Sequence, residues 1–163
     1  MNMIVTADDN WAIGNRGRRL VSIPSDNRFV QEETQGKVVV LGRRALADLP
    51  HRQLLPDRTN LVLTSDPTCR IRGAETLPDL AHLLQRLQAF PSEDVYVLGG
   101  ESTFRQLLPY CDLIHVTKMH HHYQADAWFP NLDELDEWVI TGDSEEQTYF
   151  DLEYHFFRYE RRK

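Results

Sequence analysis

The sequence predicts an α/β fold: a central, mostly parallel sheet of about eight strands that ends in a C-terminal antiparallel hairpin and is flanked by about four helices. Three observations predict it. Short β-type runs alternate with helical patterns through most of the chain. These runs are apolar nearly throughout, as in "VVVL" and "VYVL", which is typical of parallel strands covered on both faces. Near the end, two β-type runs follow each other without a helix between them, which indicates antiparallel pairing.

The parallel part is expected to alternate strands and helices in a regular order. Strands are expected where short apolar runs occur, at residues 3–7, 37–42, 59–65, 94–100 and 112–119. Helices are expected between them, at residues 23–34, 43–49, 77–90 and 101–110. The first helix begins with Pro24, which suits the first helical position. Its spacing places Asp26 on the same face as Phe29 and Val30.

The C-terminal hairpin is predicted from alternation. The last run, residues 148–162, places Phe150, Leu152, Tyr154 and Phe156 on one face, with Asp151, Glu153 and His155 on the other. It follows the run 137–142 through the turn-prone segment "TGDSEEQ". Residues 14–23 form an irregular segment rich in Gly and Arg, and such internal loops are often functional lids.

Length and composition narrow the class of protein. A chain of 163 residues suits a single domain spanning residues 1–163. No apolar run approaches the roughly 18 residues of a membrane span, and no secretory signal is recognisable, so we expect a cytoplasmic protein. The net charge of −7 argues against a nucleic-acid-binding surface, so an anionic ligand would need local arginines. Cys69 and Cys111 fit no metal or redox spacing and are expected to be reduced.

Two strand-to-helix turns carry the chemistry of phosphate binding. Gly99 and Gly100 end one predicted strand, and glycines there allow backbone amides to approach a phosphate at a helix N-terminus. Gly42 ends another, followed by Arg43 and Arg44, which are unfavourable beside a positive helix end unless an anion compensates them. Turn geometry alone also explains the glycines, and solvation alone the arginines. Because two such turns occur in one sheet, binding of a dinucleotide at these strand ends explains them as well as the simpler alternatives do.

Three further features each have two interpretations. Asp26 stands at the third helical position, where a carboxylate can instead cap the helix by accepting backbone N–H groups and complement its dipole. Arg58 is suited to bind a ligand carboxylate, or to form a salt bridge with Asp57 or another acid. The run His120–Tyr123 is interpreted as a solvated loop rather than a metal site, because no second cluster completes a ligand set.

Taken in order, the segments "AIGNRG", "IPSD", "KVVVLGRR", "LPDRTNLVLTS", "VYVLGGES", "IHVTKM" and "DAWFPNL" resemble dihydrofolate reductase over nearly the whole chain. The resemblance implies reduction of dihydrofolate to tetrahydrofolate with NADPH, by a monomer. It makes Asp26 the acid that hydrogen-bonds the pterin, supported by Thr117, and Arg58 the partner of the glutamate-tail carboxylate. It implies a substrate site formed by Ile4, Val5, Thr6, Val21, Asp26, Val30, Leu49, Leu55, Arg58 and Thr117.

The resemblance also implies where NADPH binds. A cis peptide is expected between Gly99 and Gly100, and the loop 14–23 is expected to close over the nicotinamide, held by Asp126. The implied cofactor site comprises Thr6, Ile13, Gly14, Gly42, Arg43, Arg44, Ala45, Leu63, Thr64, Ser65, Leu98, Gly99, Gly100, Glu101, Ser102, Thr103 and Phe104.

The chain departs from the family's usual residues around this site. Val21 stands where the family commonly has Trp, Val30 where it has Phe, Ala45 where it has Thr, and Phe104 where it has Tyr. Because Val21 and Val30 alter the substrate pocket, we predict weakened binding of diaminopyrimidine antifolates. Inhibition constants measured against a reductase that has Trp and Phe at these positions would check this, and equal affinity would contradict it.

Two other functions are compatible with the same residues. One is the related pyrimidine reductase of riboflavin synthesis, although the helix acid together with Arg58 favours folate. The other is a non-catalytic protein that binds folate or NADPH, suggested by Val21 and Ala45.

Overall fold

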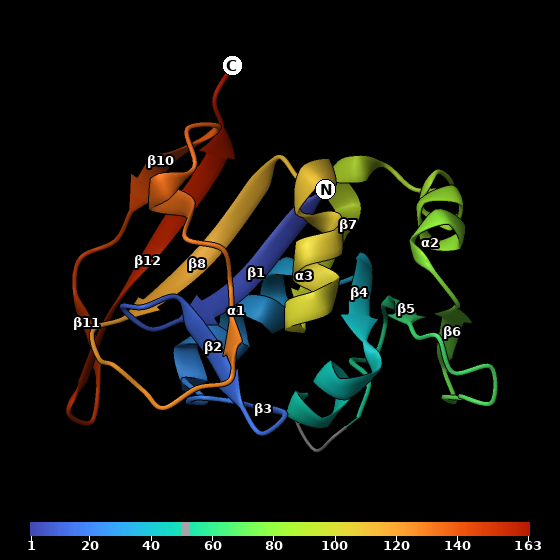
Figure 1. Cartoon of the computed structure of the whole chain (residues 1–163), viewed down its shortest axis with the longest axis horizontal. Coiled ribbons are helices and arrows are strands. Elements are labelled where there is room, and N and C mark those ends of the chain that lie inside the picture. The colour runs from blue at the N-terminus through green and yellow to red at the C-terminus, as the bar shows by residue number, and fades with distance from the viewer. Residues whose placement is uncertain (50–52) are drawn as a thin grey trace.

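The structure is a computed structural model that describes residues 1–49 and 53–163. Its main sheet has the strand order β10-β12-β8-β1-β7-β4-β5-β6, with β11 attached to β12 (Figure 1). The parallel strands are β1 (Asn2–Ala7), β4 (Val38–Gly42), β5 (Thr59–Leu63), β6 (Ala74–Leu77), β7 (Val95–Gly99) and β8 (Leu113–Met119). The antiparallel end comprises β10 (Trp138–Asp143), β11 (Gln147–Tyr149) and β12 (Leu152–Arg161). The predicted fold class is therefore confirmed.

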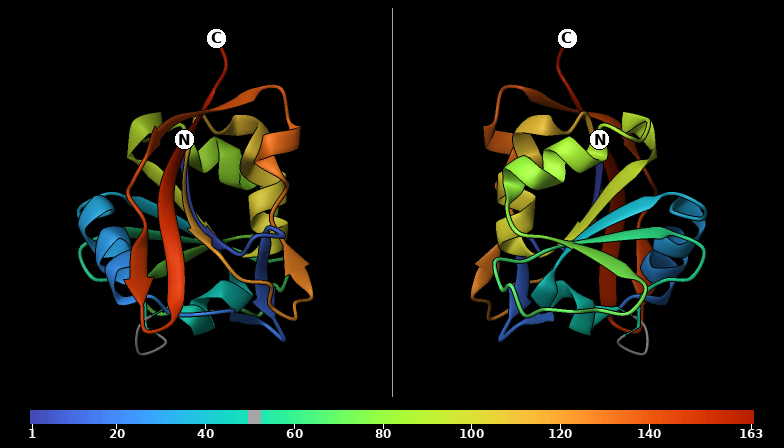
Figure 2. Two further views of the ribbon diagram at one scale, coloured as in Figure 1. Left: turned by 90° about the vertical axis from the view of Figure 1, so that its left-hand side faces the viewer. Right: turned by 90° about the vertical axis from the view of Figure 1, so that its right-hand side faces the viewer.

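Helices cover both faces of the sheet. Figure 2 shows α1 (Pro24–Glu33) on one face, and α2 (Leu80–Leu87) and α3 (Glu101–Leu107) on the other. The predicted helix at 43–49 is a 3₁₀-helix, η1 (Arg43–Asp48). The predicted helix at 77–90 begins later than expected, because Leu77 ends β6 and Asp79 caps α2 by accepting the His82 N–H at 2.9 Å.

The main core lies between the sheet and the helices α2 and α3. Val40, Val97, Leu83, Leu107 and Ile114 are all buried there. These valines belong to the continuous apolar runs of β4 and β7, as expected for strands covered on both faces. Among the described residues, no helix is long and apolar enough to cross a membrane.

The C-terminal run is two strands rather than one. Phe150 adopts a positive φ of 54° between β11 and β12, and its side chain is 86% exposed. The chain reverses there, so that Tyr149 pairs with Leu152. The prediction of Phe150 on a buried face is therefore wrong, because alternation continues only as far as a strand does. Tyr154 is buried, as the alternation from Leu152 onward requires.

The segment expected to be irregular also contains strands. β2 (Ala12–Asn15) pairs with β3 (Arg18–Arg19) and with β9 (Ala127–Trp128) in a separate three-stranded sheet. Arg16 and Gly17, with φ of 53° and 78°, form the turn between β2 and β3. Positive φ at both central residues suits a two-residue hairpin turn. The expected loop is thus a short hairpin attached to a distant part of the chain.

Candidate active site

The site lies at the switch point of the sheet, where the connections that follow two neighbouring strands run over opposite faces. β1 and β7 are parallel neighbours, with Asn2 beside Tyr96 and Met3 beside Val97. The connection after β1 includes α1 on one face, and the connection after β7 includes α3 on the other (Figure 2). In open α/β sheets, such a switch point leaves a crevice at the carboxyl ends of the strands. Most of the residues predicted for substrate and cofactor lie at or just after the carboxyl ends of β1, β4, β5 and β7, or on α1. Thr117 lies on β8, Ile13 and Gly14 lie on β2, and Arg58 directly precedes β5.

Asp26 is the buried residue of α1, with 2% of its surface exposed. Its Oδ1 accepts a hydrogen bond from Thr117 Oγ1 at 2.8 Å, and its Oδ2 accepts one from Thr6 Oγ1. Thr6 and Thr117 are opposite one another in the β1–β8 pair. The described hydrogen bonds of the Asp26 carboxylate go to these hydroxyls and not to helix N–H groups. Asp26 therefore joins α1 to β1 and β8, and does not act as a helix cap.

Burial raises the pKa of Asp26 above its usual range. The hydrogen bonds from Thr6 and Thr117 and the positive charge of Arg19 oppose this rise. The carboxylate is thus costly to ionise, and hydroxyl donors do most to offset that cost.

The apolar side chains predicted for the substrate site differ in how deeply they are buried. Ile4 and Leu55 are buried, whereas Leu49, Val30 and Val21 are half-buried. Val21 packs with the small cluster of Ile23, Met119 and Tyr154.

Val5 stands apart from the rest of the predicted substrate site. It lies between Ile4 and Thr6 on β1 but packs into the main core. Successive residues of a strand point to opposite faces, so the side chains of Ile4 and Thr6 are directed away from that of Val5.

Arg58 is half-buried beside the C-terminal end of α1. Its Nε donates to Thr34 Oγ1 at 3.1 Å, its Nη1 to the Pro56 carbonyl at 2.5 Å, and its Nη2 to the Gln31 carbonyl. Burial lowers the pKa of Arg58, and the charge of Asp57 opposes this. Among the described carboxylates none forms an ion pair with Arg58, so the guanidinium is held by neutral groups. The alternative of an Asp57–Arg58 salt bridge is not observed.

The two glycine turns lie side by side. Leu41 of β4 pairs with Gly99, and Gly42 pairs with Leu63 of β5. A Cβ on Gly42 would lie 2.7 Å from Thr103 Oγ1 and 3.6 Å from the Gly100 nitrogen.

Several other predicted cofactor residues gather around these turns. Gly99 and Gly100 are joined by a cis peptide, as the resemblance implied. No side chain caps the N-terminus of α3, which carries Glu101, Ser102 and Thr103. Ala45 and Phe104 flank Gly99: a Cβ there would lie 3.6 Å from each. Backbone amides and small residues therefore lie where the glycine turns were predicted to bind a phosphate.

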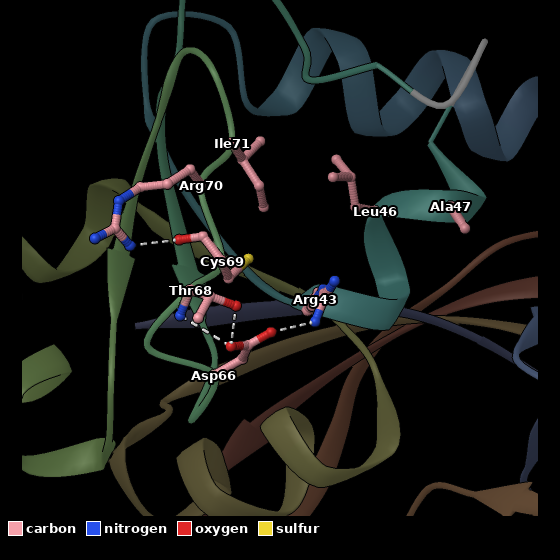
Figure 3. A pocket seen from close by; sticks show the side chains of 8 residues that line it. All are labelled: Arg43, Leu46, Ala47, Asp66, Thr68, Cys69, Arg70 and Ile71. Atoms are coloured by element: carbon pink, nitrogen blue, oxygen red, sulfur yellow. Dashed lines mark hydrogen bonds and ion pairs between the residues drawn. The ribbon is translucent and has the colours of Figure 1, made fainter.

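Next to the turns is a cavity of about 510 Å³ (Figure 3). Arg43 and Asp66 both line it, and Arg43 Nη1 contacts Asp66 Oδ2 at 2.8 Å. Arg44 and Ser65 are exposed nearby in the chain, and Thr64 Oγ1 accepts the Asp66 N–H at 3.2 Å. Hydrogen bonds from Thr68 lower the pKa of Asp66 and keep it ionised. This acid was not singled out from the sequence, although its place directly after the predicted strand 59–65 was a usable signal.

The hairpin β2–β3 is held by Asp126. The Arg16 N–H donates to Asp126 Oδ2 at 3.0 Å, and the Asp126 N–H donates to the Gly14 carbonyl at 3.0 Å. These contacts agree with the predicted role of Asp126. Ile13 is half-buried and Gly14 buried within β2.

His120, in the predicted loop 120–123, contacts Asp9 and His155. His120 Nε2 lies 2.5 Å from His155 Nδ1, a contact that the sequence did not reveal. Within the described part of the chain, no three His, Cys, Asp or Glu side chains form a group suited to a metal ion. Cys69 and Cys111 are free and buried.

Comparisons with known proteins agree with this arrangement. The family model described as dihydrofolate reductase matches residues 1–161. The chain is 32% identical to the dihydrofolate reductase of Staphylococcus haemolyticus and 28% identical to that of Bacillus subtilis strain 168. Each alignment covers 99% of this chain and 95% of the relative.

A solved structure has the same fold. It is the dihydrofolate reductase from Enterococcus faecalis complexed with NADP(H) and RAB-propyl, with a TM-score of 0.86 and 26% sequence identity. The match covers 99% of this chain and 96% of that one. Family model, relatives and fold agree over nearly the whole chain, and the chain therefore belongs to the dihydrofolate reductase family.

Proposed function

We propose that this enzyme, in reducing 7,8-dihydrofolate to 5,6,7,8-tetrahydrofolate with NADPH, uses Asp26 to hold the pterin at the end of β1. The observation that carries this proposal is the buried Asp26 carboxylate, fixed by Thr6 and Thr117 beside the sheet's switch point. An ionised carboxylate accepts hydrogen bonds on both oxygens, so it suits a ligand edge that presents an amino group and a ring N–H. The pyrimidine reductase alternative is not favoured by the family match.

Arg58 is proposed to bind the α-carboxylate of the glutamate tail. Its contacts to Thr34, Pro56 and Gln31 hold the guanidinium in place without neutralising it. A planar guanidinium recognises a carboxylate with two parallel hydrogen bonds. Leu49 and Leu55 are proposed to flank the ring between the pterin and the tail, with the side chains of Ile4, Thr6, Val21 and Val30 around the pterin. Val5 contributes only its backbone there, because its side chain packs into the main core.

NADPH fits the groups around the two glycine turns. The close approach of Gly42 to Thr103 leaves no room for a side chain there, whereas a Cβ on Gly100 would meet no atom within 4 Å. Open space beside the uncapped N-terminus of α3 suits a phosphate. Arg43, Arg44, Thr64 and Ser65 are proposed to hold the adenosine phosphate. When bound, NADPH supplies the hydride.

The chain's own residues position the pterin and control water. Asp26 is the acid that contacts the pterin, and it orients the ring and biases its electronics. No described side chain is an obvious direct donor to the ring nitrogen that gains a proton. We therefore infer that the β2–β3 hairpin, held by Asp126, admits the water that delivers it.

We also propose that the chain acts as a single domain, as a monomer in the cytoplasm, without binding nucleic acid. The acidic net charge of −7 supports the last point. Two free, buried thiols are typical of proteins from a reducing compartment.

One experiment tests the proposed role of Asp26. NADPH oxidation is followed by absorbance with dihydrofolate, for the wild type and for Asp26→Asn. The variant is expected to turn over about 100-fold more slowly while still binding NADPH. Asp151→Asn, an exposed acid of the C-terminal hairpin, is the matched control and should keep wild-type activity. Binding of both ligands by the wild type without oxidation would instead indicate a non-catalytic homologue.

A further inference from the structure

Asp26 has a threonine hydroxyl on each carboxylate oxygen. Thr117 Oγ1 donates to Oδ1 at 2.8 Å, and Thr6 Oγ1 donates to Oδ2. The two donors come from neighbouring strands at the same register, so the sheet itself sets their spacing. A carboxylate held at one oxygen can still turn about its Cβ–Cγ bond, whereas one held at both cannot. The Thr6 hydroxyl therefore completes the constraint that Thr117 begins.

The two threonines occupy different surroundings. Thr117 is buried in the middle of β8, with 3% of its surface exposed. Thr6 is half-buried, near the end of β1 where the proposed site lies. Oδ2 of Asp26 is thus the oxygen whose protein donor is the less buried of the two and lies near the end of β1. A carboxylate oxygen accepts about two hydrogen bonds, so Thr6 leaves one acceptor position on Oδ2 for a ligand.

Few other groups stabilise the ionised form of Asp26. Arg19, on β3, is the charged group that acts on it, and the Arg19 Nη1 donates to Asn27 Oδ1 at 3.0 Å rather than to Asp26. From β12, the Tyr154 hydroxyl lies 2.7 Å from Ser25 Oγ instead. From β1 and β8, the groups facing the carboxylate are the two threonine hydroxyls. Among the described residues, Thr6 therefore provides one of the two direct donors to a buried charge.

We propose that Thr6 is a positioning residue for the reaction: its hydroxyl holds Oδ2 of Asp26 so that the ionised carboxylate presents its remaining acceptor positions to the pterin. This rests on the proposed role of Asp26. Valine at this position has nearly the same shape but cannot donate, so the carboxylate loses a donor without losing packing. Serine keeps the donor and loses only a methyl group.

The closing experiment measures the ionisation of Asp26 directly and does not depend on turnover. The ¹³C signal of the Asp26 carboxyl is titrated by NMR in the ligand-free wild type, Thr6→Val, Thr6→Ser and Thr6→Ala. Loss of the donor removes a contribution that lowers the pKa of Asp26. The titration midpoint is therefore expected to move up by about one pH unit in Thr6→Val and Thr6→Ala, and to return towards wild type in Thr6→Ser.

The same variants are then assayed for reduction of dihydrofolate across pH. The pH-rate midpoint that disappears in Asp26→Asn is expected to shift upward with the NMR midpoint. An unchanged or lowered NMR midpoint in folded Thr6→Val, or a Thr6→Ser variant that behaves like Thr6→Val, would overturn the proposal. If Thr6→Val does not fold, Thr6→Ala against Thr6→Ser gives the same comparison. A wild type that does not reduce dihydrofolate would count against the proposed function, whereas a failed shift in an active wild type counts only against Thr6.

Discussion

Asp26 combines two properties that usually exclude each other, deep burial and an acidic side chain. Desolvation raises its pKa, and two hydroxyl donors recover only part of the cost. A group of this kind weakens the fold in which it ionises. Its place in the interior is explained by the proposed contact with a ligand and not by a gain in stability.

The stability of the protein is expected to depend on Asp26 in a defined pH range. Because the folded pKa lies above the unfolded value of about 3.9, the folded state binds more protons between the two values, and the free energy of unfolding falls as pH rises through this range. Asp26→Asn lacks this dependence. Urea unfolding at a series of pH values should show the difference, Asp26→Asn minus wild type, growing from about pH 4 and levelling off above the folded pKa. A constant difference would contradict the raised pKa.

Arg58 can be separated from the rest of the site by choice of substrate. Arg58→Gln is expected to raise KM for dihydrofolate by about 10- to 100-fold with little change in kcat, because a charged hydrogen-bonded pair is lost. A dihydropteroate that lacks the glutamate tail should show no such increase. Arg58→Lys, which keeps the charge without the planar fork, should fall between the two. Equal losses for both substrates would mean that Arg58 acts only through Thr34, Pro56 and Gln31.

At the scale of elements, the cofactor site depends on how closely two turns approach. The end of β4 and the start of α3 meet at Gly42 and Thr103, where no further atom fits. The apolar run of β4 explains why the strand is buried, and Gly42 explains how the next turn can lie against it. The arginines of η1 then follow directly in the chain.

Gly42→Ala is expected to weaken NADPH binding by about tenfold or more, since its Cβ would lie 2.7 Å from Thr103 Oγ1 and force the turns apart. The Kd measured by fluorescence titration checks this. KM for dihydrofolate should change much less. Gly142→Ala is the matched control, because its Cβ would meet Arg158 at an ordinary 3.5 Å. Unchanged NADPH affinity in folded Gly42→Ala would show that the approach of the turns is not needed.

At the scale of the molecule, one sheet supports both halves of the site. The parallel strands β1, β7 and β4 are consecutive neighbours in the sheet. Thr6, which donates to Asp26, and the two glycine turns therefore all lie at the carboxyl ends of these strands. A ligand bound at these strand ends contacts groups that are close together only in the folded protein. The overall charge of −7 opposes an anionic cofactor, which leaves attraction to local cations such as Arg43 and Arg44.

Binding of NADPH is accordingly expected to stabilise the whole fold. At a free concentration 100 times Kd, the free energy of unfolding should rise by about 2.7 kcal/mol. The urea midpoint with and without NADPH measures this. In Arg43→Gln the same NADPH concentration should give a smaller increase, because Kd rises. An identical increase would show that Arg43 pairs only with Asp66 and does not contact the cofactor.

The sequence by itself determined the order of the main strands and helices, the parallel sheet with its antiparallel end, and the family, because apolar periodicity and ordered motifs are local properties of the chain. It did not indicate the short strands β2, β3, β6 and β9. It also indicated Asp26 and Arg58 as unusual, while leaving a helix cap and a salt bridge open. Only the tertiary structure decided against both, by placing Asp26 between Thr6 and Thr117 and Arg58 among neutral groups. The reversal at Phe150, the pairing of β2 with β9 and the Arg43–Asp66 contact were likewise settled by folding. Each of these three features depends on partners distant in sequence or on a backbone turn. Neither distant partners nor a turn produce a periodic pattern in the sequence.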